Sequence, residues 1–383
     1  MKKFFLFLFV LFLLTYQPIN LSTNCLYAVE NLNLTETKLA TIPLDYQEVS
    51  NIIFSANGKQ VAYKVRKEGK EFVVVGNKAG KPYDQVVKEG DILLSSDGQR
   101  VAYQARRGKE EYLVFDGKES EPYDDVSPTT FGPDGGLVVC EVGNKGKWFV
   151  IVSDGKKEIF HSPHYDSSNI APVFSPDNRL VAYVLSDQER GEYTTFITDI
   201  LSGEVRKAWV SDSVGKVVFG GGGSRFALVA RREGKSFMVI GDLVLNEERE
   251  GPPFDWIGVL FSLSSDSRQV AYETEKGGRK FVVVSDWVSP AAVKENGPYD
   301  FVGVPVFSPD GSLVAYPAWK EGKWYVVIGE KEGPFYDGVV SPVFSPDGLK
   351  VAYPAAKDGK WFLVVGHLIG DLPMRQAEGP AYD

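Results

Sequence analysis

Two histidines and a nearby aspartate are the first residues whose types and spacing could support chemistry. His161, His164 and Asp166 lie in the stretch His-Ser-Pro-His-Tyr-Asp, and imidazole with carboxylate is a ligand set that zinc accepts. Pro163 breaks any helix that would place both imidazoles on one face, and no other His or Cys completes the set. The pattern leaves a metal site open, but it favours a plain connecting loop, and we expect neither a metal nor a cofactor.

Other catalytic signatures are missing from the sequence. There is no Gly-x-Ser-x-Gly motif, which speaks against a serine hydrolase of that type. The four glycines at 220–223 lack the Lys and the following Ser or Thr of a phosphate-binding loop, so a loose turn is the better interpretation. His367 follows an expected strand and is interpreted as a surface residue. With no catalytic constellation, we predict that the protein is not an enzyme.

A Tyr-Asp pair recurs along the chain. The pairs are Tyr83-Asp84, Tyr123-Asp124, Tyr165-Asp166, Tyr299-Asp300 and Tyr336-Asp337. Their carboxylates could form a ring near one mouth of a channel. The alternative, which we favour, is that each Asp caps a turn while each Tyr packs between repeated units.

The seven tryptophans divide into two groups. Trp148, Trp324 and Trp361 share one position in an expected strand, so core packing explains them better than sugar binding. The others fall off this register and are the candidates for an exposed contact; they are Trp209, Trp256, Trp287 and Trp319.

Basic residues gather in one recurring set of turns, built around Gly-Lys. The candidate partner-binding residues in these turns are Arg106, Arg107, Lys145, Arg231, Arg232, Arg279, Lys320 and Lys357, which we call the basic rim. A second set of turns carries Asp. Because the two sets would emerge on opposite faces, we expect an electrically polarised molecule, although the charges could simply keep the hairpins soluble. A basic face would suit an acidic protein or an anionic polymer of the cell envelope.

A repeated phrase supplies the elements that must position these residues. Residues 307–311 read Phe-Ser-Pro-Asp-Gly and are followed by Val-Ala-Tyr, and residues 344–348 begin a second clear copy. Eight copies are anchored at Asn57, Asp97, Asp134, Asp177, Gly222, Asp266, Asp310 and Asp347, with 37 to 45 residues between successive anchors. Periods of this size are typical of solenoids, propellers and arrays.

Each repeat can be divided into strands and turns. A short strand leads into Ser-Pro-Asp-Gly, a second strand ends at the Gly-Lys turn, and a third strand is rich in aromatic and β-branched residues. We interpret the closing Gly-Pro and Tyr-Asp-x-Val as a short fourth strand plus the crossing to the next repeat. Four antiparallel strands in such a repeat make one propeller blade. The predicted fold is an all-β propeller of eight blades, or of seven if the unit around Phe219 is degenerate.

The Phe-Ser-Pro-Asp-Gly-x-x-Val-Ala-Tyr phrase resembles the repeat of bacterial TolB-like propellers, which are relatives of the WD repeat. The resemblance covers residues 45–383 and concerns the fold. The same repeat type is also similar to the propellers that are fused to prolyl-oligopeptidase-like peptidases. What the resemblance implies is an extracytoplasmic recognition module, and the fold alone does not specify its ligand.

The N-terminus has the organisation of a bacterial-type secretory signal. Met1-Lys2-Lys3 is basic, residues 4–14 are apolar, and a polar stretch reaches Ala28. We expect a signal peptide at 1–28, a lead-in at 29–44 that could supply a closing strand, and the propeller at 45–383. Lipidation at Cys25 is not favoured, because Asn24 is a poor residue before a lipidated Cys. The C-terminal residues 379–383 begin a further unit and could help to close the ring.

Composition sets limits on the partner. The formal net charge of −9 argues against a general nucleic-acid binder. After cleavage only Cys140 remains, so no intrachain disulfide forms, and Cys140 is expected to be a buried strand residue. We expect a monomer without a membrane span after cleavage, in the periplasm or secreted. The predicted function is a non-enzymatic scaffold that recognises a protein or an envelope polymer; the alternative is a carbohydrate-active or metal-dependent enzyme on the same propeller.

Overall fold

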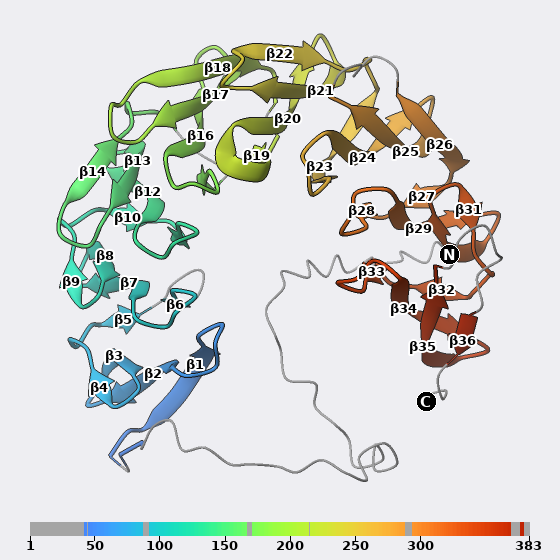
Figure 1. Ribbon diagram of the computed structural model, residues 1–383. Coiled ribbons are helices and arrows are strands. Elements are labelled where there is room, and N and C mark those ends of the chain that lie inside the picture. The colour runs from blue at the N-terminus through green and yellow to red at the C-terminus, as the bar shows by residue number, and fades with distance from the viewer. Residues whose placement is uncertain are drawn as a thin grey trace, which may run out of the picture. The chain divides into compact units, whose positions relative to one another are not determined.

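The computed structural model describes residues 42–43, 45–86, 92–166, 171–213, 215–287, 293–368 and 376–378. In these ranges the chain forms eight antiparallel sheets that follow one another in chain order, and we call them blades 1 to 8 (Figure 1). The helical residues in these ranges form the single 3-10 turn η1 (Gly221–Gly223). The predicted all-β class and the count of eight blades are confirmed.

The first four blades are built as follows. Blade 1 contains β1 (Glu48–Phe54), β2 (Val61–Lys67), β3 (Lys70–Val75) and β4 (Lys78–Ala79). Blade 2 contains β5 (Gln85–Val86), β6 (Leu93–Leu94), β7 (Val101–Arg107), β8 (Glu110–Phe115) and β9 (Lys118–Glu119). Blade 3 contains β10 (Asp125–Val126), β11 (Thr130–Phe131), β12 (Val138–Asn144), β13 (Lys147–Ser153) and β14 (Glu158–His161). Blade 4 contains β15 (Val173–Phe174), β16 (Leu180–Asp187), β17 (Glu192–Asp199) and β18 (Val205–Ser211).

The last four blades repeat this plan. Blade 5 contains β19 (Val218–Phe219), β20 (Arg225–Arg232), β21 (Lys235–Asp242) and β22 (Glu247–Glu250). Blade 6 contains β23 (Trp256–Leu263), β24 (Gln269–Lys276), β25 (Arg279–Asp286) and β26 (Lys294–Tyr299). Blade 7 contains β27 (Phe301–Val302), β28 (Val306–Phe307), β29 (Val314–Lys320), β30 (Lys323–Ile328) and β31 (Lys331–Glu332). Blade 8 contains β32 (Gly338–Val339), β33 (Val343–Phe344), β34 (Lys350–Lys357), β35 (Lys360–His367) and β36 (Gln376–Glu378). The unit around Phe219 therefore forms a blade of its own.

The Tyr-Asp-x-Val segment connects two consecutive blades and pairs with both. Gln85 and Val86 pair with β7 and thus begin the first strand of blade 2, whereas the fourth strand of blade 1 is β4, which precedes the segment. The first strands of blades 2, 3, 7 and 8 consist of two short pieces that both pair with the second strand. The residues up to Tyr do pair with the third strand of the preceding blade, as Tyr83 does with Glu71 and as β26 does with β25, so the predicted fourth strand and crossing are confirmed; only the residues after Asp belong to the next blade.

The Ser-x-Asp turn between the first and second strands is closed by its own side chains. In blade 7 the Ser308 hydroxyl donates to Asp310 over 2.5 Å and accepts the amide of Leu313, while Asp310 also accepts the amide of Ser312. The fourth position of the turn has a positive φ, which is 74° at Gly311. Glycine adopts this conformation without steric strain.

Apolar side chains fill the space between consecutive blades. Ala62 and Val73 of blade 1 pack against Tyr103 and Val114 of blade 2, and all four side chains are buried. Comparable clusters join later pairs of blades. Small Ala residues in the second strands, such as the fully buried Ala62 and Ala102, allow the sheets to approach closely. No helix that could cross a membrane occurs in the described ranges.

The N-terminal predictions concern a separate part of the chain. The predicted signal peptide, Cys25 and nearly all of the predicted lead-in lie outside the described residues, as do residues 379–383.

Candidate functional site

The basic rim lies on the turns that join second and third strands. In blade 1 this turn has two successive residues with positive φ, 52° at Glu68 and 75° at Gly69. That geometry matches the right-handed twist of the two strands that it joins. The shared turn type places Lys and Arg at equivalent heights from blade to blade. However, the first turn residue is often acidic, as at Glu68, Glu233, Glu321 and Asp358, so negative charge accompanies the basic residues.

The Asp of each Tyr-Asp pair caps one of these turns. An oxygen of Asp84 accepts the amide of Gly108 in blade 2 over 2.6 Å, and the other oxygen accepts a bond of 2.5 Å from the Lys70 ammonium of blade 1. The amide of Gly108, followed by Lys70, lowers the pKa of Asp84 from its ordinary value. Tyr83 beside it is fully buried. The turn-cap interpretation is therefore confirmed, and the alternative of carboxylates that line a channel is not supported at this pair.

The same cap occurs in the following blades. The accepting carboxylates and the donating amides are Asp124 with Lys145, Asp166 with Gln188, Asp212 with Glu233, Asp255 with Gly277, Asp300 with Glu321, and Asp337 with Asp358. Asp212 and Asp255 perform this role without the preceding Tyr, which is why the Tyr-Asp pattern did not reveal them.

Several rim residues are already engaged by carboxylates of the chain. Arg107 donates to Glu119 over 2.8 Å and lies above the ring of Tyr83. Arg232 donates to both carboxylate oxygens of Glu250 over 2.5 Å. Arg279 forms an ion pair of 3.0 Å with Asp300. These three guanidinium groups are held by the blades and are less available to a partner.

Four other rim residues make no ion pair in the described ranges, although the pKa of Asp84, lowered chiefly by the Gly108 amide, is lowered further by the nearby charge of Arg106. The side chains of Arg106, Lys145, Lys320 and Lys357 make no ion pair and no side-chain hydrogen bond with any residue in the described ranges. They belong to blades 2 and 3 and to blades 7 and 8, which are two pairs of consecutive blades. Arg231 is intermediate, because its guanidinium donates to the carbonyl of Gly234 over 3.4 Å. The available part of the basic rim is therefore smaller than the sequence suggested.

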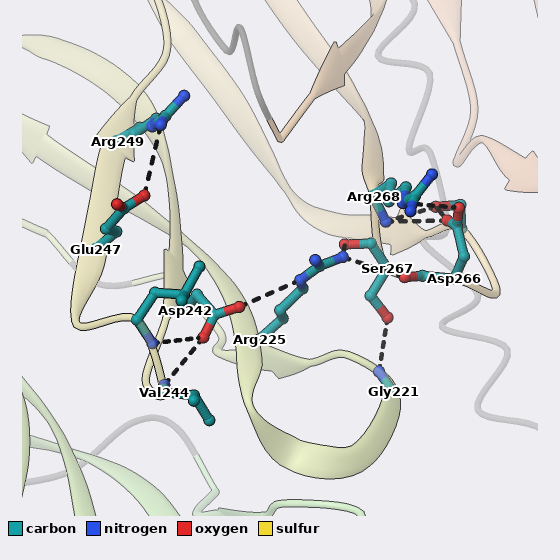
Figure 2. A network of polar contacts seen from close by, with 11 residues as sticks. Gly221, Arg225, Asp242, Val244, Glu247, Arg249, Asp266, Ser267 and Arg268 are labelled. Carbon is teal, nitrogen blue, oxygen red and sulfur yellow. Dashed lines mark hydrogen bonds and ion pairs between the residues drawn. The ribbon is translucent and has the colours of Figure 1, made fainter.

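Figure 2 shows a polar network at the opposite ends of blades 5 and 6. Arg225 occupies its centre: Nε lies 3.4 Å from Asp242, and Nη1 donates to the carbonyl oxygens of Asp266 and Ser267. The hydroxyl of Ser267 in turn accepts the amide of Gly221 over 2.6 Å, so the glycine run of blade 5 docks on the turn of blade 6.

Equivalent pairs join Arg100 to Asp116 and Arg179 to Asp199, both at this end of the blades. Each turn set thus carries charges of both signs. The two turn sets lie at opposite ends of the blades, but neither has a single sign, because acidic residues and Asp caps accompany the basic rim and these arginines accompany the Asp-bearing turns. In the sequence these contacts could have been found from an Arg that lies two or three residues after the anchor of a repeat, as Arg100 does after Asp97 and Arg179 does after Asp177.

The two histidines form an aromatic cluster. His161 and His164 both stack on Phe149, with ring centroids 4.1 and 4.9 Å away, and Nδ1 of His161 lies 2.7 Å from the carbonyl oxygen of Ser162. Across the described ranges, no group of three or more His, Cys, Asp and Glu side chains is placed to hold a metal ion. His161 also borders a groove of about 530 Å³ between blades 2 and 3, whose floor includes Phe115 and whose margin carries Lys118.

The tryptophans do not follow the predicted division. Trp287, an off-register candidate for an exposed contact, is buried, and Trp209 packs on Phe226 while its indole N–H donates to Glu248. Trp361, which was assigned to the core, is 47% exposed. Trp361 does occupy the predicted position in the third strand, but its side chain is exposed in blade 8.

The remaining thiol has the environment that was expected. Cys140 lies in the second strand of blade 3 and is fully buried. Burial raises the pKa of this thiol well above its ordinary value, so it stays protonated and unreactive at neutral pH.

Comparison with known sequences finds no match for the chain, whereas comparison with solved structures finds similar folds. No family model and no curated protein sequence matches the chain. Among solved structures, a eukaryotic initiation factor is 14% identical, with a TM-score of 0.54 and 92% of each chain covered. This likeness concerns the fold alone. The chain is an eight-bladed β-propeller.

Two further solved structures are similar at lower scores. TolB from Acinetobacter baumannii is 17% identical, with a TM-score of 0.36, covering 76% of this chain and 79% of TolB. The Dos1 propeller is 12% identical, with a TM-score of 0.43, covering 76% of this chain and 84% of the other. The expectation of a propeller built from TolB-like, WD-like repeats is confirmed for the fold, through the eight four-stranded sheets themselves. What the propeller binds is a separate question.

Proposed function

We propose that the chain is an exported, non-enzymatic propeller that binds an acidic protein or an anionic envelope polymer through its basic rim. The observation that carries this proposal is the set of four unpaired cations on the rim: Arg106, Lys145, Lys320 and Lys357. Carboxylates of the chain neutralise Arg107, Arg232 and Arg279 nearby, so the free cations are a distinct subset of the turn residues.

The repeat supports this function through geometry. The Asp caps fix each turn relative to the crossing, so the cations on consecutive blades are held at matching heights. Exposed charges act over about 8 to 10 Å at physiological salt, which allows a polyanion that spans neighbouring blades to contact more than one of them. Such contacts contribute to the rate and selectivity of association, and they weaken as salt is raised.

The test uses charge reversal of the unpaired set. The variant carries Arg106→Glu, Lys145→Glu, Lys320→Glu and Lys357→Glu, and the probe is fluorescently labelled poly-L-glutamate. A matched control carries Lys59→Glu, Lys78→Glu, Lys118→Glu and Lys156→Glu, which change the net charge equally at four exposed sites outside the rim.

We expect the rim variant to lose binding while the control retains most of it, with both folded by circular dichroism. Raising the salt concentration should weaken the parent in the same way as the rim variant. Equal losses in both variants would show that only net charge matters, and binding that is indifferent to all eight changes would overturn the rim as the contact.

Export is tested separately. The basic, apolar and polar order of the first 28 residues supports removal of a signal peptide, which would leave a mature N-terminus near Val29. N-terminal sequencing of protein recovered from the envelope or from the medium checks this expectation. Recovery of soluble protein that retains Met1 would contradict export without affecting the proposed role of the rim.

A further inference from the structure

The outer strands of the blades differ in how well they are protected against pairing with a strand of another chain. Strands β4, β9 and β31 have only two residues each. The four residues of β22 are all charged, and β26 contains Pro298. Short length, charge and proline are the common devices that prevent a sheet edge from pairing with another chain. Strand β18 of blade 4 is seven residues long, reads Val-Arg-Lys-Ala-Trp-Val-Ser, and contains no proline.

The two cations of β18 do not guard its edge. Arg206 is paired with Glu204 over 3.0 Å, and Lys207 lies 3.6 Å from Glu248 of blade 5. Trp209 donates to the same Glu248 over 3.1 Å. The residues of β18 that face blade 5 are thus occupied by packing and by ion pairs. Among the described residues, β18 pairs only with β17, so its other edge presents backbone N–H and C=O groups without a neighbouring strand.

The opposite side of β18 continues into a groove. Ala208 and Val210 lie directly across from Phe196 and Thr194 of β17, and cross-strand partners share one face of a sheet. Phe196 and Thr194 line a groove of about 370 Å³ between blades 3 and 4. Val210, on the same face of blade 4, is 55% exposed. The groove and the free edge therefore form one continuous surface.

This groove carries more negative than positive charge. Its lining includes Asp166, Asp187 and Glu189, with Lys147 as the cation among the lining residues. Asp166, followed by Glu189 and Asp187, raises the pKa of Lys147, which shows that all three carboxylates act on this position. Lys147 pairs with Asp166 over 2.5 Å and Arg190 pairs with Asp187 over 3.5 Å, so three carboxylates face two cations here and a further cation would meet a net negative charge.

We propose that β18 is a docking strand for an extended segment of a partner protein that carries two apolar residues and then a basic residue at every second position, so that all three face the groove. The segment would join blade 4 as an additional strand. Its apolar side chains would cover Ala208 and Val210, and a Lys or Arg would reach the groove beside Glu189. An extended backbone is the group that can satisfy a row of N–H and C=O groups along seven residues.

The dimensions suit this arrangement. Adjacent strands lie about 4.8 Å apart, so an added strand would lie about 10 Å from β17, and a Lys or Arg on its groove side together with the Glu189 side chain spans that separation. The site differs from the basic rim in charge and in the element that forms it. It therefore adds a second binding surface, and it does not depend on the proposed function.

The experiment uses the full chain and a labelled synthetic peptide, Thr-Thr-Val-Thr-Val-Thr-Lys-Thr, whose two Val and one Lys lie on the same face of a strand. Fluorescence anisotropy measures its affinity, and hydrogen exchange maps the protected amides. We expect the peptide to bind and to protect amides within 205–211. Val210→Lys should weaken binding by about tenfold or more, because a Lys at the edge opposes strand addition. Val259→Lys is the matched control, since Val259 is also 55% exposed but lies on β23.

The role of the groove is read from a second pair of measurements. Glu189→Gln should weaken binding of the Lys peptide but not of a peptide with Gln in place of Lys. Absence of binding, protection outside 205–211, or equal effects of Val210→Lys and Val259→Lys would overturn the proposal. Self-association of the chain that is abolished by Val210→Lys would assign the edge to a second copy of this protein and would also overturn it.

Discussion

The carboxylate of Asp84 accepts the backbone amide of Gly108 over 2.6 Å, although 24 residues separate them in the chain. Asp84 belongs to the crossing between blades 1 and 2, and Gly108 belongs to the turn between the second and third strands of blade 2. Because the other oxygen of Asp84 holds Lys70 of blade 1, one side chain fixes two consecutive turns. The arrangement recurs at Asp255, which accepts the amide of Gly277 and the ammonium of Lys235.

The first prediction separates the two bonds of Asp84. Asp84→Ala removes both the cap and the ion pair, whereas Lys70→Ala removes the ion pair alone. Exposed ion pairs contribute little to stability, so we expect Asp84→Ala to lower the urea midpoint clearly more than Lys70→Ala does. The Gly108 amide should also exchange faster in Asp84→Ala. Equal midpoints for the two variants would show that the amide bond is not the important contact.

A second prediction concerns the contact between successive Ser-x-Asp turns. Gly135 of blade 3 has φ of 71°, and a Cβ atom there would lie 2.7 Å from Cβ of Ser95 in blade 2. Gly135→Ala should therefore combine left-handed strain of about 1 to 2 kcal/mol with an overpacking cost of about 1 to 3 kcal/mol. Denaturant unfolding measures the sum.

The matched control for this prediction lies in the same blade. Gly146 has φ of 74° with nothing within 4 Å of its virtual Cβ, so Gly146→Ala should show the strain alone. If both variants lose the same stability, the turns of blades 2 and 3 are not in close contact.

The sequence was sufficient to predict the repeating scaffold. The conformational preferences of the turn residues in Ser-Pro-Asp-Gly and Gly-Lys act within a few residues. Their positions therefore defined correctly where the second strand begins and where it turns into the third. The burial of Tyr83 and the capping role of Asp84 also followed from residue type.

Contacts between distant residues could not be predicted in the same way. Val86 is a good strand residue in either blade, and only its pairing with Ala105 assigns it to blade 2. Arg232 pairs with Glu250, but the two residues lie on different strands, β20 and β22, and the sequence does not predict which side chains of these strands meet. For the same reason the sequence overestimates the number of unpaired cations on the basic rim. It also does not show that β18, with seven residues, is longer than most other outer strands.

The third prediction compares two buried tyrosines. The hydroxyl of Tyr83 donates to Glu119 over 2.8 Å, whereas the buried hydroxyl of Tyr272 has no partner among the described residues. Tyr83→Phe should lower the free energy of unfolding by about 1.5 to 3 kcal/mol, the usual contribution of a hydrogen bond to a charged group. Tyr272→Phe should leave it unchanged or slightly raised, because an unsatisfied polar group is removed. A clear loss in Tyr272→Phe would reveal a bound water or another partner at that hydroxyl.

The last prediction concerns acid stability. The hydroxyl of Ser308, followed by the amide of Ser312, lowers the pKa of Asp310 to about 2 from an ordinary value of 3.8. Because the folded state holds the carboxylate in its charged form, its stabilising effect is complete above 3.8 and is lost as the pH falls toward about 2. Urea midpoints of the parent, measured from pH 5 to pH 2, should therefore decrease.

Two variants assign part of that decrease to this turn. Asp310→Asn removes the titrating group, and Ser308→Ala removes the hydrogen bond that chiefly lowers its pKa. Both should be less stable than the parent at pH 5, and both should lose less stability on acidification, so the curves should converge near pH 2. Curves that remain parallel to that of the parent would show that Asp310 does not contribute to the acid sensitivity of the propeller.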